Sequence, residues 1–221
     1  MNEEIMRFSS DWFYGNQVES APEVKYRSIL DLDIPMTWID TSQFEECGGR
    51  SEEGEYSDAD ISHSTLLPPP SSIFKEQFVG ESFGRINKAE AELTLLVLEQ
   101  YFQKIGKQRI LDERLDVGVI SPYRAQVQYL RRLFKKKEFF KPYRSLISVN
   151  TVDGFQGQER DIILISLVRA NEEGQIGFLR DLRRMNVAIT RARMKLIILG
   201  DASTMTRHPF YKRLYDYIEA L

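Results

Sequence analysis

The sequence has very little of what metal centres and disulfide frameworks require. It contains one cysteine, Cys47, and two histidines among 221 residues. A single cysteine excludes an internal disulfide and is typical of a reducing cytoplasm, where we expect the protein to act. One cysteine and two histidines also argue against a structural zinc site, so we expect no bound metal of that kind.

Long apolar runs are missing as well. No run of 18 apolar residues occurs, so we expect no membrane span. The first 15 residues are acidic and amphipathic, and they lack the basic start and apolar core of a signal peptide. Hydrophobic residues still make up 42% of the chain, which is enough for a sizeable core.

The net charge of −3 hides an asymmetry between two parts of the chain. Residues 1–66 carry 15 acidic and 4 basic side chains, a balance of −11, whereas residues 67–221 carry 18 and 26, a balance of +8. The later part is therefore suited to face a polyanion. Residues 41–72 are acidic, rich in glycine and serine, and closed by three prolines, which predicts a mobile surface loop.

Helical and strand patterns alternate along the chain. We expect helices at residues 1–14, 87–106, 124–137, 181–193 and 206–221, and strands at residues 36–40, 116–123, 146–152, 161–168 and 195–201. The strand segments are rich in valine and isoleucine without alternation, which is typical of strands buried on both faces. The length allows one large domain or one and a half small ones, and the pattern predicts an α/β fold with a mainly parallel sheet covered by helices on both faces.

Two features mark the ends of the helix at residues 87–106. Asn87 and Glu90 have the spacing of a capping box, with asparagine in place of serine or threonine. Gly106 stands where a C-cap glycine is expected.

Polar residues gather where the expected strands end. The clusters are Ser121–Arg124, Asn150–Asp153 and Gly200–Asp201. In parallel sheets ligands bind outside the carboxyl ends of the strands, so these clusters are candidate contacts. The segment Gln156–Glu159 continues the second cluster and holds two amides, a glycine and a carboxylate. It could hold ribose hydroxyls, or it could be an ordinary surface turn.

Arginines on the helix expected at residues 181–193 allow two readings. Four apolar residues at helical spacing would face the sheet: Leu182, Met185, Ile189 and Ala192. Arg184 and Arg191 would then share another face, two turns apart. A guanidinium on a rigid helix suits the stabilisation of phosphoryl charge, but a solvated basic face is the alternative. The basic helix at residues 124–137 leaves the same choice between phosphate contact and solvation.

Four stretches together resemble motifs IV, V and VI of the superfamily 1B helicases. They are Ser121–Gln126 ("SPYRAQ"), Asn150–Asn171, Gly177–Arg193 and Leu196–Asp201. The similarity is greatest to the branch named after the RNA helicase of nonsense-mediated decay and its DNA-acting relatives. It also includes residues 1–15 and 83–93, and the motifs occur in the family's order and at its intervals. It therefore covers nearly the whole chain except the acidic loop.

The resemblance implies a fold and a missing partner. In these helicases ATP lies in a cleft between two RecA-like domains, and the first supplies a Gly-x-x-x-x-Gly-Lys-Ser/Thr loop and the carboxylates that hold Mg²⁺. No such loop occurs in this sequence. The resemblance therefore implies that residues 1–221 are a single RecA-like domain, the second, C-terminal one of a longer protein, in which Met1 is an internal methionine. ATP and Mg²⁺ would be bound mainly by the first domain, and the chain alone would be inactive.

The resemblance also assigns roles to single residues. Arg191 matches the arginine that reaches the γ-phosphate, and Glu159 would meet the ribose of ATP beside Gln156 and Gly157. Arg193 is expected to be structural. Single-stranded DNA or RNA would cross the carboxyl ends of the strands. The residues expected to contact it are Ser121, Tyr123, Arg124, Asn150, Thr151 and Asp153.

The sequence departs from the family pattern at two places in this region. Gly154 stands where alanine is usual, and Gln158 stands where arginine is usual. A second reading, from a different class of protein, is a non-catalytic interaction module that kept the RecA-like fold. The presence of Arg191, Glu159 and Gln156 argues against it, because a binding platform has no need of them.

Overall fold

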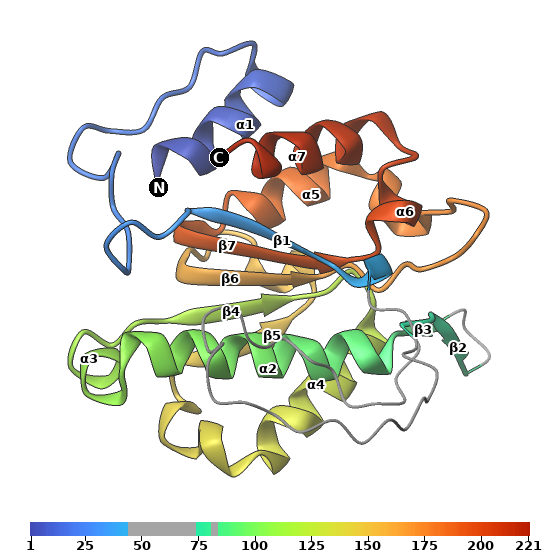
Figure 1. Ribbon diagram of the computed structural model, residues 1–221, viewed down its shortest axis with the longest axis horizontal. Helices are drawn as coiled ribbons and strands as arrows, with labels where there is room; N and C mark the ends of the chain where they lie inside the picture. Colours follow the sequence, from blue (N-terminus) through green and yellow to red (C-terminus); the bar gives the residue numbers. More distant parts are fainter. Residues whose placement is uncertain (44–73, 81–83) are drawn as a thin grey trace, which may run out of the picture.

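The computed structural model describes residues 1–43, 74–80 and 84–221. Five parallel strands form one sheet in the order β1-β7-β6-β4-β5 (Figure 1). Their bounds are Met36–Asp40 (β1), Val117–Ile120 (β4), Ile147–Asn150 (β5), Arg160–Ser166 (β6) and Ala192–Gly200 (β7). A separate antiparallel hairpin joins β2 (Gln77–Val79) to β3 (Gly84–Ile86). The predicted α/β fold with a mainly parallel sheet is confirmed.

Helices cover both faces of the sheet, which makes three layers (Figure 1). The helices are α1 (Glu3–Tyr14), α2 (Lys88–Ile105), α3 (Lys107–Asp112), α4 (Arg124–Lys136), α5 (Leu182–Ile189), α6 (Ala202–Met205) and α7 (Pro209–Glu219). Helices α2 and α4 lie on one face, and α1, α5 and α7 lie on the other. Among the residues that the structure describes, no helix combines the length and apolarity that crossing a bilayer requires.

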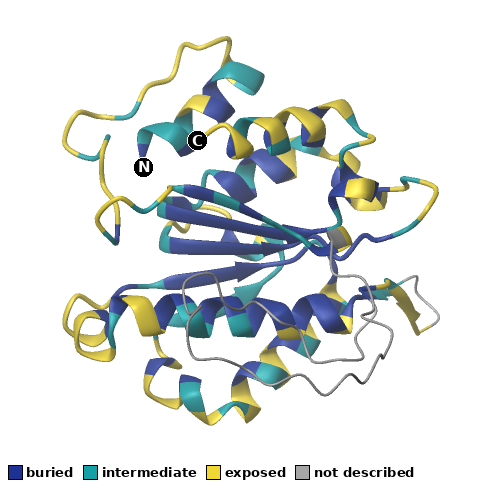
Figure 2. Cartoon of the chain, viewed as in Figure 1, coloured by how far each residue is buried: buried dark blue, intermediate teal, exposed yellow. Residues whose placement is uncertain are grey.

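Strand β6 shows why its sequence is a continuous apolar run. Successive side chains of a strand point to opposite faces of the sheet. Ile162 and Leu164 join the core that includes Phe102 of α2, whereas Ile163 and Ile165 join the core that includes Phe210 of α7. Because both faces are covered, the central strands β4, β6 and β7 are mostly buried, whereas the edge strands β1 and β5 are largely half-buried (Figure 2).

The helix expected at residues 181–193 is shorter than its periodicity suggested. Helix α5 ends at Ile189, and Ala192 is already the first residue of β7. Pairing with β6 ends the helix, because the backbone N–H of Arg160 donates to the carbonyl of Arg191 (2.8 Å). Arg191 therefore stands on a turn, and the prediction that Arg184 and Arg191 share a helix face was wrong.

Some expected features of the chain were found and others were not anticipated. The helix at the N-terminus and the C-cap at Gly106 are confirmed. The β2–β3 hairpin, α3 and α6 were not predicted. Of the expected acidic loop, residues 41–43 form a 3₁₀ turn in which Thr41 is buried. Residues 44–72 of that loop, with Cys47, lie outside the described residues.

The capping box at the start of α2 is only half formed. The Asn87 side chain accepts from the N–H of Glu90 (3.0 Å), as an N-cap should. The N–H of Asn87 itself donates to Oε1 of Gln126 (3.0 Å) rather than to Glu90. The Glu90 carboxyl is directed instead toward the end of β6, where it accepts from Ser166 and Val168.

Candidate functional site at two edges of the sheet

The predicted site residues lie at two opposite edges of the sheet. Ser121 follows β4 and Thr151 follows β5, at the carboxyl edge where the strands end. Glu159 precedes β6 and Arg191 precedes β7, at the amino edge where the strands begin. Gln156–Glu159 follows the Asn150–Asp153 cluster in the sequence, as expected, but Glu159 lies at the amino edge and not beside that cluster at the carboxyl edge. Strand β6 has seven residues, so the two edges lie roughly 20 Å apart.

One short connection joins these edges. Residues 151–159 carry the chain from the end of β5 back to the start of β6, partly as the 3₁₀ turn η3 (Val152–Phe155). Parallel strands are more often joined by a dozen or more residues that include a helix. Phe155 is buried against Gly118 of β4, where an added Cβ would lie 2.8 Å from the ring. The glycine allows the connection to lie directly on the sheet.

The carboxyl edge includes a close contact between Asn150 and Gly154. Oδ1 of Asn150 accepts from the N–H of Thr151 (2.9 Å). A Cβ at position 154 would lie 2.2 Å from Nδ2 of Asn150. Alanine at this position would therefore displace the Asn150 side chain.

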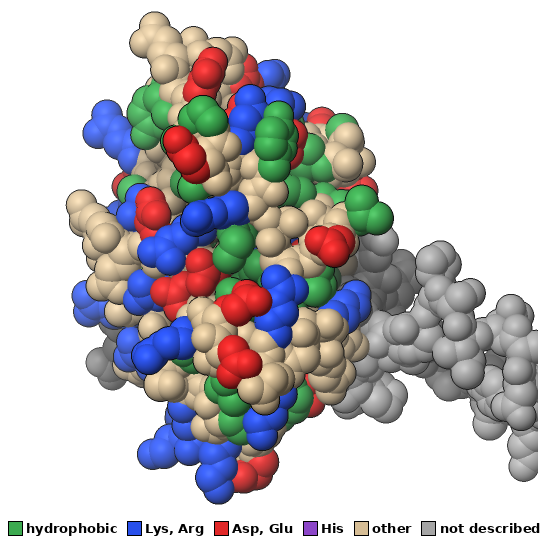
Figure 3. All heavy atoms as spheres, turned by 90° about the vertical axis from the view of Figure 1, so that its left-hand side faces the viewer, with side chains coloured by type: hydrophobic (Ala, Val, Ile, Leu, Met, Phe, Trp, Pro, Cys, Tyr) green, Lys and Arg blue, Asp and Glu red, His purple; other side chains and the backbone are tan. Residues whose placement is uncertain are grey.

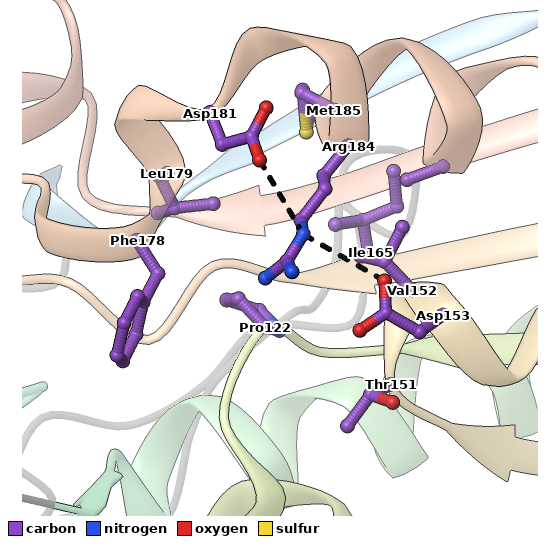
Figure 4. A pocket seen from close by; sticks show the side chains of 11 residues that line it. Pro122, Thr151, Val152, Asp153, Ile165, Phe178, Leu179, Asp181, Arg184 and Met185 are labelled. Atoms are coloured by element: carbon purple, nitrogen blue, oxygen red, sulfur yellow. Dashed lines mark ion pairs between the residues drawn. The ribbon is translucent and has the colours of Figure 1, made fainter.

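A shallow hollow opens beside this connection. Thr151, Asp153, Phe178 and Arg184 are among its lining residues. The Arg184 guanidinium lies between two carboxylates, 3.7 Å from Asp153 and 3.4 Å from Asp181 (Figure 4). Arg184 offsets only part of the negative charge of Asp153 and Asp181, because one guanidinium is shared by two carboxylates. Arg184 and Phe178 were not among the predicted contact residues.

The residues that follow β4 differ in exposure. The Ser121 side chain is buried, and its Oγ has no hydrogen-bond partner among the described residues. Tyr123 is also buried, and its hydroxyl accepts from Arg169 (3.3 Å). Arg124, the first residue of α4, is exposed. Of the six predicted nucleic-acid contacts, Arg124 and Asp153 are exposed, Asn150 and Thr151 are half-buried, and Ser121 and Tyr123 are buried.

A buried carboxyl lies behind this edge. Oε1 of Glu90 accepts from Oγ of Ser166 (2.5 Å) and from the N–H of Val168 (2.8 Å). Val168 has φ 72°, which a β-branched residue rarely adopts. Burial raises the pKa of Glu90 to about 8, although both hydrogen bonds act in the opposite direction. Sequence reasoning missed this role because the spacing of Glu90 also suits a capping box.

Arg191 stands at the amino edge with its charge unpaired. Its Nε donates to the carbonyl of Val187 (3.1 Å) and its Nη2 donates to Oγ1 of Thr190 (3.3 Å). Both acceptors are neutral, and no carboxylate in the described part of the chain forms an ion pair with this guanidinium. The side chain is half-buried, so its position is restrained while its charge remains available to an anion.

The predicted nucleotide-side residues near Arg191 are exposed. Gln156, Gly157 and Glu159 all face solvent. Gly157 has φ 74°, the left-handed conformation that favours glycine. Oε2 of Glu159 accepts from Nε of Arg193 (3.5 Å), which holds the carboxylate near the start of β6.

Arg193 is part of a local charge network. It lies 3.4 Å from Asp161, 3.5 Å from Glu159 and 3.9 Å from Asp116. Burial alone would lower the pKa of Arg193, but these acidic neighbours outweigh it and raise the pKa. Figure 3 shows the side of the molecule where the strands begin, with basic and acidic side chains interleaved. The charge of Arg193 is therefore paired with carboxylates, whereas the Arg191 guanidinium donates to neutral oxygens.

Comparison with known proteins identifies the family of the chain. A family of AAA domains, AAA_12, matches residues 1–203. The chain belongs to the AAA_12 family. This AAA_12 domain is 34% identical over its whole length to an uncharacterized ATP-dependent helicase of Methanocaldococcus jannaschii. It is 40% identical over its whole length to the DNA replication ATP-dependent helicase/nuclease DNA2 of Mus musculus.

A third relative is more similar over a shorter part. Helicase sen1 of Schizosaccharomyces pombe is 51% identical over 100 residues, which are 45% of the AAA_12 domain and 6% of that helicase. The relatives belong to the superfamily 1B helicases, so the predicted family is confirmed. The domain spans 28% of the archaeal relative and 20% of the mouse relative, less than a third of either.

Proposed function

We propose that this domain is the C-terminal motor domain of an ATP-dependent DNA or RNA helicase or translocase. It would work with a first RecA-like domain of the same protein. The observation that carries the proposal is the connection at residues 151–159, which begins at the exposed carboxyl edge and ends beside Glu159 and Arg191. The relatives named as ATP-dependent helicases support it.

The residues at the amino edge fit one wall of a nucleotide cleft. The Arg191 guanidinium is held by two neutral oxygens and keeps its full charge for a phosphate. The exposed carboxylate of Glu159 is suited to accept hydrogen bonds from ribose hydroxyls. Mg²⁺ would neutralise phosphate charge when ATP is bound, and its carboxylate ligands would come from the first domain.

The carboxyl edge fits a backbone-binding surface for a single strand. The Thr151 side chain and the loop N–H groups can hold phosphates, and Arg124 adds an exposed positive charge. Such contacts do not read bases directly, so we expect binding to be largely independent of sequence and weaker at high salt. The connection would link movement at this edge to the state of the nucleotide.

The test is single-strand-stimulated ATP hydrolysis by the longer protein that contains this domain. Arg191→Ala should lower turnover at least about 10³-fold, since an arginine that stabilises transferred phosphate contributes that much. The change should leave the thermal midpoint nearly unchanged. Arg183→Ala, at an exposed position of α5, is the matched control and should keep full turnover. Wild-type turnover in Arg191→Ala would reject the proposed role and favour a non-catalytic interaction module.

A further inference from the structure

Two phenylalanine rings stand exposed at the carboxyl edge. Phe178 is 63% exposed and Phe78 is 65% exposed. Phe178 lies on the 3₁₀ turn η4 (Gly177–Arg180) and lines the hollow, on the side away from Asp153 (Figure 4). Phe78 lies on the β2–β3 hairpin, which packs against the start of α4 through Gly84 and ends where α2 begins (Figure 1).

Buried groups hold the Phe178 ring in place. The ring lies 5.7 Å from that of Tyr123, whose hydroxyl accepts from Arg169. Gly177 has φ 56°, and a Cβ there would lie 2.6 Å from Nη1 of Arg169 and 2.9 Å from the Tyr123 hydroxyl. The turn that carries Phe178 is therefore packed directly onto two buried side chains.

The same buried arginine also supports the second ring. Arg169 is 3% exposed and forms an ion pair with Glu76 (2.7 Å). Glu76 pairs in turn with Arg85, whose guanidinium lies 4.1 Å from the centre of the Phe78 ring. A continuous series of contacts thus joins the two exposed rings through a largely buried salt bridge. Single exposed apolar residues are ordinary on protein surfaces, but two rings braced in this way are not explained by chance exposure.

We propose that Phe178 and Phe78 form a two-ring platform that stacks nucleobases of the bound single strand. This inference rests on the proposed function, because it places bases beside a backbone that follows Thr151 and Arg124. Aromatic rings stack on every base, so such a platform adds affinity without reading sequence. Arg85 occupies one face of the Phe78 ring and leaves the other to solvent. A rigid platform loses less entropy on binding than a mobile side chain.

The experiment compares two probes by fluorescence anisotropy at low salt. One is a labelled strand of about 12 thymidines, a length within the range that stacking grooves bind. The other is a strand of equal length made of abasic sites. Phe178→Ala should weaken binding of the thymidine strand by about fivefold or more, as expected for the loss of one stacking ring. It should leave binding of the abasic strand unchanged, and Phe178→Tyr should restore affinity. Phe78→Ala should have the same selectivity.

Two controls separate stacking from other roles. Arg124→Ala should weaken both strands equally, because it removes a backbone contact. Tyr26→Ala removes an aromatic ring that is 82% exposed on a segment joined to α1, and it should change neither affinity. If Phe178→Ala weakens both strands equally, or neither, the platform is refuted while the proposed function stands. The measurements use the longer protein that contains this domain, and if its wild type binds neither strand, the proposed function fails together with the platform.

Discussion

Replacing Glu90 with glutamine should remove a large part of the pH dependence of this domain's stability. Burial raises the pKa of Glu90 from 4.5 to about 8 in the folded state. Between these values the folded state binds one proton more than the unfolded state, so the free energy of unfolding falls as pH rises. The protonated carboxyl makes its full contribution to the free energy of unfolding below pH 4.5, and this contribution is lost as pH approaches 8.

The magnitude follows from the separation of the two pKa values. One pKa unit corresponds to about 1.4 kcal/mol, so between pH 5 and pH 8 the free energy of unfolding should fall by a few kcal/mol, on the order of two pKa units or more. Glutamine has nearly the same shape, stays neutral, and can accept the same two hydrogen bonds from Ser166 and Val168. The free energy of unfolding of Glu90→Gln should therefore not show the loss that Glu90 causes between pH 5 and pH 8.

The assay is urea unfolding of the wild type and Glu90→Gln at several pH values from 5 to 8. The difference between the two proteins cancels the titration of other groups, such as Asp161, whose pKa is also raised by burial. We expect the difference in the free energy of unfolding to move in favour of glutamine by a few kcal/mol, on the order of two pKa units or more, over this range. A difference that stays constant within about 0.5 kcal/mol would show that Glu90 is ionised in the folded protein. Glu90→Ala should destabilise at every pH, since it removes both hydrogen bonds.

Three further predictions concern the proposed motor function. The 221-residue chain alone should show no steady ATP hydrolysis, because it lacks the phosphate-loop lysine that phosphoryl transfer needs; activity above a mock-purified control would contradict this. In a salt titration, Arg124→Ala should weaken single-strand binding and flatten the salt slope by about one unit, whereas Thr151→Ala should weaken it with the slope retained. An unchanged affinity in both variants would show that the single strand does not contact Arg124 or Thr151 and binds elsewhere. Gly154→Ala should displace Asn150 and cost about 1–3 kcal/mol of stability by urea unfolding, and a neutral result would mean that the side chain has room to move.

The pattern of apolar and polar residues along the chain was sufficient to predict the layers of the fold. Runs such as Ile162–Ile165 are apolar at every position, and only a strand covered on both faces buries all of them. The hairpin β2–β3 lacked such a signal, because its strands have three residues each and Phe78 and Val79 are exposed. Its position depends on the Glu76–Arg169 ion pair, which joins residues 93 positions apart in the sequence.

The sequence by itself determined which residue types this protein brings to a ligand, together with the helicase family to which they belong. It could not determine where those residues meet in space. Periodicity placed Arg184 and Arg191 on one helix face, yet pairing of β6 with β7 ends α5 early and leaves Arg191 on a turn at the opposite edge from Arg184. Strand pairing uses backbone N–H and carbonyl groups, which every residue type has, so the side-chain pattern does not show where pairing begins. The end of α5 therefore depends on the pairing of β7 with β6, which only the tertiary structure reveals. Because β5 and β6 both run parallel to β4, residues 151–159 begin at the carboxyl edge, after β5, and end at the amino edge, before β6.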